Sequence, residues 1–183
     1  MATQASTAEL VAALYRVDGK AEIVGGEIVL MSPTGGIPSR AAAAIYRSLW
    51  DYERRTRLGR AYTDNIGFLV DLPRRKSFSP DTSFHVGPPP GPKFLPGAPI
   101  FAAEVRSEED YGPAAERAMA QKRADYFAAG TQVVWDVDVL REGLIQAYRA
   151  TAPDAPNAYH RGERAEAEPA LPGWSFSVDD IFE

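Results

Sequence analysis

Two acidic residues stand in apolar stretches where charged side chains are unusual. Asp81 lies between Phe78 and Phe84 in FSPDTSF, and Glu104 lies in IFAAEVRS, residues 100–107. Both stretches are typical of strands, and carboxylates are rarely buried unless they are paired or bind a metal. The two acids therefore require a nearby cation. With a lysine added, they are the residue types that a metal-dependent phosphodiesterase uses.

A lysine stands on the expected inner face of the next helix. This helix is predicted over residues 113–129, with Pro113 near its first position and Gly130 as its C-terminal cap. The side chains at three-to-four spacing that form its inner stripe are Ala115, Ala118, Met119, Lys122, Tyr126 and Ala129. Alternatively, the stem of Lys122 packs while its ammonium reaches water. Because a helix that follows a strand usually packs on the same sheet, we expect Lys122 to face the acids.

The roles that follow are those of a magnesium-dependent hydrolase. Asp81 and Glu104 are predicted to hold one or two Mg²⁺ or Mn²⁺ ions, and Lys122 to orient water or stabilise charge on the phosphate. Glu22, beside the turn of an expected hairpin, is the fourth candidate. Each acid has a structural alternative: Asp81 caps a backbone N–H, Glu104 pairs with Arg106, and the hairpin acids are exposed. Without metal, the clustered carboxylates are expected to repel one another.

Composition narrows the class of protein. The chain has 183 residues, no cysteine and a net charge of −5, so a disulfide framework and nonspecific coating of nucleic acid are not expected. The absence of cysteine suits the cytoplasm. His85 and His160 have no partner at the spacing of a zinc site, and no GxSxG, GxGxxG or P-loop pattern occurs.

The remaining patterns predict an α/β fold with a mixed sheet, in one domain over residues 1–183. Ser6 and Glu9 fit a capping box for a short helix, and Gly25-Gly26 joins two short strands in a hairpin. A long helix is expected from Ser39 to about Gly59. Strands are expected within residues 61–72, 78–84, 100–106, 131–139 and 144–149, and the second of these lies at a sheet edge or is kinked at Pro80, which lacks an N–H. Residues 151–170 are expected to form a loop around a weak strand near Tyr159.

The chain resembles the Uma-two family, which is placed among the PD-(D/E)XK restriction-endonuclease-like proteins. The resemblance covers about residues 8–182. The residues and motifs that carry it are Glu22, Gly26, Glu27 and Pro33 of the hairpin region, Pro80-Asp81, Glu104-Val105-Arg106-Ser107, Lys122, Tyr126, Gly130, Trp135, Asp138 and Leu171-Pro172-Gly173. The chain departs from the family pattern at residues 37–40, where members often carry a histidine.

The resemblance implies a restriction-endonuclease-like core, with Asp81 and Glu104 as metal ligands. Such nucleases usually carry their lysine two residues after the second acid, where this chain has Arg106, and the family moves the lysine to the following helix, which matches Lys122. The implied function is a metal-dependent endonuclease that hydrolyses DNA phosphodiester bonds as a homodimer.

Two other functions remain open. One is a noncatalytic nucleic-acid-binding or interaction protein that retains the fold, and the other is a small-molecule phosphodiesterase. The nuclease is favoured if the basic residues of the sequence line the same cleft as the acids. These residues are Arg54, Arg55, Arg57, Arg74, Arg75 and Lys76.

Overall fold

A computed structural model describes residues 5–183. Its helices are α1 (Thr7–Leu14), α2 (Gly36–Thr56), α3 (Pro113–Ala128) and the short 3₁₀ helix η1 (Val178–Phe182). Its strands are β1 (Ala21–Val24), β2 (Glu27–Leu30), β3 (Arg60–Tyr62), β4 (Phe68–Leu69), β5 (Ser77–Phe78), β6 (Thr82–His85), β7 (Leu95–Pro96), β8 (Phe101–Val105), β9 (Val133–Asp138), β10 (Leu144–Arg149), β11 (Ala152–Tyr159), β12 (Arg164–Glu166) and β13 (Ser175–Ser177). Among the helices of these residues, none combines the length and apolar character that a membrane crossing needs.

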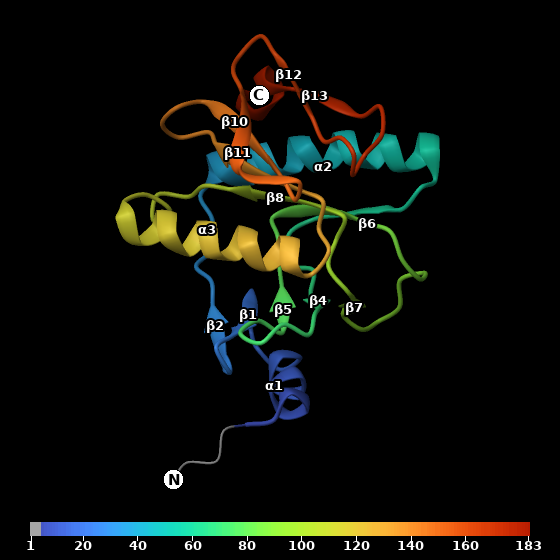
Figure 1. The fold of residues 1–183 in the computed structure, drawn as a ribbon, viewed down its shortest axis with the longest axis vertical. Coiled ribbons are helices and arrows are strands. Elements are labelled where there is room, and N and C mark those ends of the chain that lie inside the picture. Colours follow the sequence, from blue (N-terminus) through green and yellow to red (C-terminus); the bar gives the residue numbers. More distant parts are fainter. Residues whose placement is uncertain (1–4) are drawn as a thin grey trace.

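The centre of the molecule is a six-stranded sheet in the order β11-β10-β9-β8-β6-β3. Strands β8 and β9 are parallel, because α3 connects them, and the other neighbours in this sheet are antiparallel. Helices α2 and α3 lie on either side of the sheet (Figure 1). The predicted α/β fold with a mixed sheet is therefore confirmed.

Alternation along β8 and β9 decides which side chains meet which helix. Phe101, Ala103 and Val105 belong to the large core that includes residues of α2. Ala102, between them, packs in a separate core with Tyr126 of α3. Because side chains alternate across a strand, Glu104 lies on the same face as Ala102, towards α3. The alternation of side chains along β8 thus places Glu104 opposite the helix that carries Lys122.

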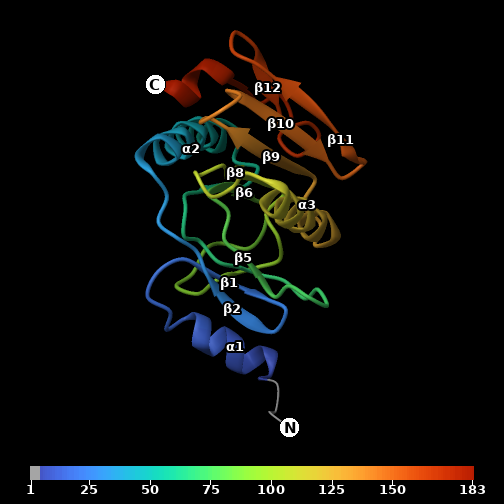
Figure 2. The ribbon, with the colours of Figure 1, turned by 90° about the vertical axis from the view of Figure 1, so that its left-hand side faces the viewer.

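The N-terminal segment forms a smaller unit beside the sheet. Ser6 and Glu9 make the predicted capping box of α1, and β1 pairs with β2 in the predicted hairpin. The hairpin attaches to the segment around β5, since the N–H of Ile23 donates to Ser77 Oγ at 2.8 Å and Lys76 N–H donates to the Ile23 carbonyl. Figure 2 shows α1 and the hairpin at the end of the molecule opposite β11 and β12. This attachment carries Glu22 into the interior.

Three predicted elements differ from the structure. Residues 78–84 form parts of two strands and not one: the chain passes from the small sheet of β5 to the large sheet at Pro80, where an edge position or a kink was expected because proline lacks an N–H. The long helix ends at Thr56, because Arg57 adopts a left-handed conformation with φ 56°. Residues 151–170 are not mainly loop, since β11 forms an eight-residue edge strand. Pro153 and Pro156, which suggested a loop, are tolerated because an edge strand needs fewer donors.

One buried histidine gives the fold a predicted pH dependence. His85 at the end of β6 is 5% exposed, and burial lowers its pKa despite a 3.2 Å contact between Nε2 and the Pro96 carbonyl. Neutral His85 therefore supports the folded state above the ordinary histidine pKa, and that support is lost as the pH falls through the lowered value. We expect His85→Gln to lose less stability than the wild type between about pH 7.5 and about pH 5.

Urea unfolding at the two pH values measures this difference. His160→Gln serves as the control, because His160 is exposed and should leave the pH dependence unchanged. Equal losses of stability in the wild type and in His85→Gln would contradict the role assigned to His85.

Candidate active site

Asp81 lies directly before β6 and is fixed against the end of β8. Its Oδ2 accepts a hydrogen bond from the N–H of Val105 at 2.8 Å, and its Oδ1 lies 2.6 Å from Nζ of Lys20. The first contact is the backbone cap that was the structural alternative for this residue. It also places the carboxylate beside Glu104, the residue preceding Val105. Asp81 and Glu104 are thus brought together, as predicted from sequence.

Glu104 meets α3 through two residues one helical turn apart. Its Oε1 lies 2.9 Å from Nζ of Lys122 and accepts a hydrogen bond from the hydroxyl of Tyr126 at 2.7 Å. Burial raises the pKa of Glu104; the charge of Lys122 opposes this effect and that of Asp81 adds to it. The predicted inner position of Lys122 is confirmed, since its side chain is only 17% exposed. The predicted inner face of this helix included one residue too many, because Ala118 is exposed.

Glu22 joins the same cluster from the hairpin but lies deeper. Its Oε1 lies 3.0 Å from Nζ of Lys122 and accepts from the N–H of Ser79 at 2.8 Å, while its Oε2 pairs with Arg75. With 2% of its side chain exposed, Glu22 has its oxygens occupied by protein groups. Lys122 thus pairs with both Glu22 and Glu104. Glu27, the other hairpin acid, is exposed and outside the cluster, as the structural alternative expected.

The cluster includes two further cations: Lys20, which the sequence did not suggest, and Arg75, which was one of the basic residues named from the sequence. Lys20 bridges Asp81 and the more exposed Asp64, with its Nζ 2.6 Å from one oxygen of each. Burial disfavours its charge, but Asp81 and Glu104 outweigh burial and the pKa of Lys20 is raised. Arg75 joins Glu22 to Asp125 of α3, with its Nε 2.8 Å from Asp125 Oδ2. One signal was available for Lys20, because it lies two residues before Glu22 and alternation puts both on one side.

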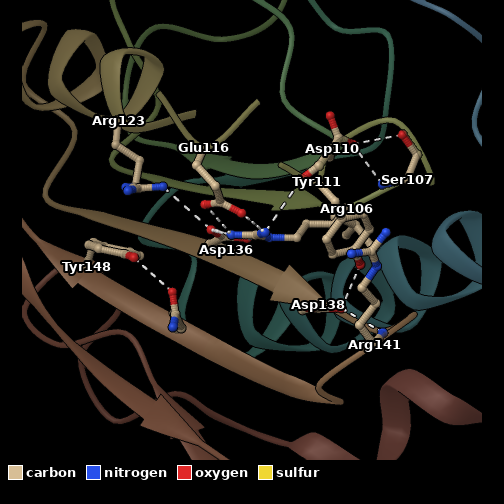
Figure 3. A network of polar contacts seen from close by, with 12 residues as sticks. Arg106, Ser107, Asp110, Tyr111, Glu116, Arg123, Asp136, Asp138, Arg141 and Tyr148 are labelled. Atoms are coloured by element: carbon tan, nitrogen blue, oxygen red, sulfur yellow. Dashed lines mark hydrogen bonds and ion pairs between the residues drawn. The ribbon is translucent and has the colours of Figure 1, made fainter. Parts of the chain in front are cut away.

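Arg106, two residues after Glu104, belongs to a different network (Figure 3). Its Nε and Nη2 bind the two oxygens of Asp136 at 2.7 Å each, and its Nη1 lies 2.5 Å from Glu116 at the start of α3. The proposed pair of Glu104 with Arg106 is therefore wrong. Bidentate pairing holds a guanidinium firmly. Arg106 stabilises the junction of β8, β9 and α3, and Lys122 is the cation at Glu104.

The carboxylates can be tested for their fit to a metal ion. Within residues 5–183, no group of three or more histidine or acidic side chains is placed to hold one. Mg²⁺ is commonly bound by one or two carboxylates and completes its shell with water and substrate phosphates. Asp81 and Glu104 are partly exposed oxygen ligands, with 19% and 24% of their side chains accessible. They fit such an open site and do not form a closed protein cage.

Of the basic residues named from the sequence, Arg75 joins the cluster, but Arg54, Arg57 and Lys76 do not. Arg75 is buried in its pairs with Glu22 and Asp125, and Lys76 pairs with the exposed Asp71 at 2.5 Å. Arg54 and Arg57 line a separate hollow at the C-terminal end of α2. The basic residues therefore do not line one cleft together with the acids, which was the condition under which charge alone would have favoured the nuclease.

The fold, with helices on both sides of a mixed six-stranded sheet, agrees with two comparisons with known proteins. The chain belongs to the Uma2 family, whose model, described as "Putative restriction endonuclease", matches residues 8–179. Among solved structures, the chain is similar to a "putative nuclease belonging to DUF820" from Anabaena variabilis, with a TM-score of 0.73 and 16% identity over 94% of this chain and 97% of the other. No curated protein matches the sequence significantly.

The buried pair of Glu22 and Arg75 yields a stability prediction. Arg75 is 6% exposed at its side chain, and its removal leaves Glu22 with fewer partners and Asp125 without its arginine. We expect Arg75→Met to lower the free energy of unfolding by about 3 kcal/mol, because breaking a buried pair leaves an uncompensated charge. Urea unfolding measures the change.

The neighbouring residue supplies the control. Lys76 pairs with Asp71, whose side chain is 93% exposed. Lys76→Met should therefore cost less than about 1 kcal/mol. Equal effects of the two substitutions would show that the Arg75 network does not stabilise the hairpin.

Proposed function

We propose that this protein is a metal-dependent endonuclease that hydrolyses DNA phosphodiester bonds. The observation that carries the proposal is the meeting of Asp81, Glu104 and Lys122, which come from three separate segments. Lys122 Nζ lies 2.9 Å from Glu104, and Asp81 is bonded to the adjacent amide of Val105. Family membership supports the same activity.

Asp81 and Glu104 would hold Mg²⁺ or Mn²⁺ between them. When bound, such an ion polarises a phosphodiester and lowers the pKa of its bound water. The protein contributes fixed ligand positions: the N–H of Val105 orients Asp81, and the hydroxyl of Tyr126 orients Glu104. Fixing the ligands before substrate arrives reduces the reorganisation needed for reaction.

Lys122 would act as the cation beside the scissile phosphate. Glu104 and Glu22 hold its ammonium from two sides, at 2.9 and 3.0 Å, so its position is set by the protein. A preorganised positive charge stabilises negative charge that develops on the phosphate oxygens. Arg106 is committed to Asp136 and Glu116 and does not supply this charge.

Lys20 adds a feature that the sequence did not suggest. Its ammonium occupies Oδ1 of Asp81 at 2.6 Å, so this oxygen is available to a metal only after Lys20 moves away. Asp64 provides an alternative partner at the same distance, and Asp64 is 47% exposed. Lys20 would thus compete with the metal for Asp81.

A noncatalytic nucleic-acid-binding protein is the second candidate. It is favoured by the pairing of each acid in the cluster with a protein cation, since an internally neutralised site has less need of a metal. Homodimer formation, which would allow cuts on both strands, stays a prediction. Metal binding and cleavage distinguish the two candidates.

We expect Lys122→Met to retain the fold and to lose cleavage by about 100-fold or more, because it removes a preorganised charge from the site. The assay follows nicking and linearisation of mixed-sequence plasmid DNA with Mg²⁺ or Mn²⁺. Circular dichroism confirms folding. Lys93→Met is the control, since Lys93 is exposed in the loop before β7. Undiminished cleavage by Lys122→Met would show that this lysine is misassigned.

Calorimetric titration with Mn²⁺ tests the ligands without a DNA substrate. We expect the wild type to bind, Asp81→Asn to lose binding, and Lys20→Met to bind more tightly, because the competing ammonium is gone. Absence of binding by the wild type would favour the noncatalytic candidate. Weaker binding by Lys20→Met would show that Lys20 supports the ligands and does not compete with the metal.

A further inference from the structure

A hollow lies at the C-terminal end of α2, away from the acids. Its volume is about 560 Å³. The residues that line it come from the end of α2, the start of β3 and the segment after β6: Glu53, Arg54, Arg57, Leu58, Gly59, Arg60, Val86 and Gly87. We call this hollow the arginine pocket.

The arginine pocket concentrates positive charge in an acidic protein. Within residues 5–183, Arg54, Arg57 and Arg60 take part in none of the ion pairs of the structure. Glu53 offsets one of the three charges, and its Oε2 accepts from the N–H of Ala61 at 2.7 Å. The pocket keeps two net positive charges, while the whole chain carries −5. Guanidinium groups match phosphate oxygens with paired donors.

The backbone at Arg57 is a second indication of a ligand. Arg57 ends α2 in the left-handed region at φ 56° and ψ 22°. Glycine is the usual residue at such a position, because a side chain there is strained. Here the position is occupied by an arginine, although glycine would fit better, and its side chain lines the pocket. Local strain of this kind is commonly found at functional sites.

The walls of the pocket favour an organic phosphate over a bare ion. Leu58 and Val86 both line the pocket and are 54% and 57% exposed. Exposed apolar side chains beside unpaired arginines suit a ligand that carries phosphate next to less polar groups. The sugar-phosphate backbone of nucleic acid has this character.

The strand register places the pocket within reach of a DNA duplex that occupies the active site. Arg60 of β3 pairs with His85, while Asp81 lies four residues earlier, before the other end of β6. At about 3.3 Å per residue, the backbone at Asp81 is about 13 Å along the strand from His85, the residue that pairs with Arg60. A duplex rises about 3.4 Å per step, so this distance corresponds to about four steps.

We propose that the arginine pocket binds a backbone phosphate of a nucleic acid whose scissile bond lies at Asp81 and Glu104. The choice of nucleic acid as the ligand rests on the proposed function. The pocket supplies the positive surface that is missing around the acids, and it positions DNA without reading its sequence.

Fluorescence anisotropy of a labelled mixed-sequence DNA duplex tests the proposal, with a chelator present so that cleavage does not interfere. The test variant is Arg54→Gln/Arg57→Gly/Arg60→Gln. The control is Arg16→Gln/Arg47→Gln/Arg74→Gln, which removes the same charge from exposed arginines outside the pocket. Titrations are run between about 50 and about 200 mM salt.

We expect the test variant to bind at least about tenfold more weakly at low salt and its salt slope to fall by about 1, since each neutralised phosphate contributes about 0.9. The control should change affinity less than twofold. Arg57→Gly alone should keep or raise the melting temperature while weakening binding. A lower melting temperature would show that Arg57 has a structural role, and equal affinities of test and control would overturn the proposal.

Titration with inorganic phosphate distinguishes the two sources of this ligand chemistry. Phosphate binding that the test variant loses, together with unchanged duplex binding, would assign the pocket to free phosphate and overturn the nucleic acid site. No duplex binding by the wild type would overturn it as well. This experiment does not measure cleavage, so it tests the arginine pocket separately from the proposed function. If the protein binds DNA through the pocket but fails to cleave it in the plasmid assay, the nuclease proposal is rejected and the arginine pocket is retained.

Discussion

The electrostatic neutralisation of buried carboxylates is the constraint on which this structure depends. Glu22 is almost fully buried and would be costly to ionise without partners. Lys122 of α3, Arg75 before β5 and the backbone of Ser79 supply those partners. One carboxylate thus ties the hairpin to the helix and to the segment that leads to Asp81. The docking of these elements and the geometry of the candidate site have the same physical cause.

The chemical types at the site were predictable from local patterns. The apolar strand around Glu104 and the helical spacing around Lys122 predicted that these two side chains face each other, and the structure brings them to 2.9 Å. These predictions succeeded because each needs only the period of one element and the tendency of consecutive elements to pack together. Their catalytic and metal-binding roles are proposals.

The pairing of charges could not be predicted in the same way. Lys20 and Asp81 are 61 residues apart, and Arg75 and Asp125 are 50 apart, so their contacts depend on how separate units dock. The sequence suggested that the acids repel one another without a metal. In the structure Lys20 neutralises Asp81 and Lys122 neutralises Glu104, and removal of either acid would take one of two acidic partners from a lysine. β11 could not be predicted from local sequence either. Its prolines indicate a loop, and they are accommodated in a strand only because this strand lies at a sheet edge.

That edge strand also restricts how copies of the protein can assemble. An exposed strand with free N–H and carbonyl groups is a template for pairing with another chain. In β11, Pro153 and Pro156 lack the N–H, and the register with β10 shifts between the partners of Ala147 and Arg149. A continuous intermolecular sheet through β11 is therefore disfavoured. The edge limits aggregation, and a pair of subunits would have to associate through other surfaces, such as the helical faces.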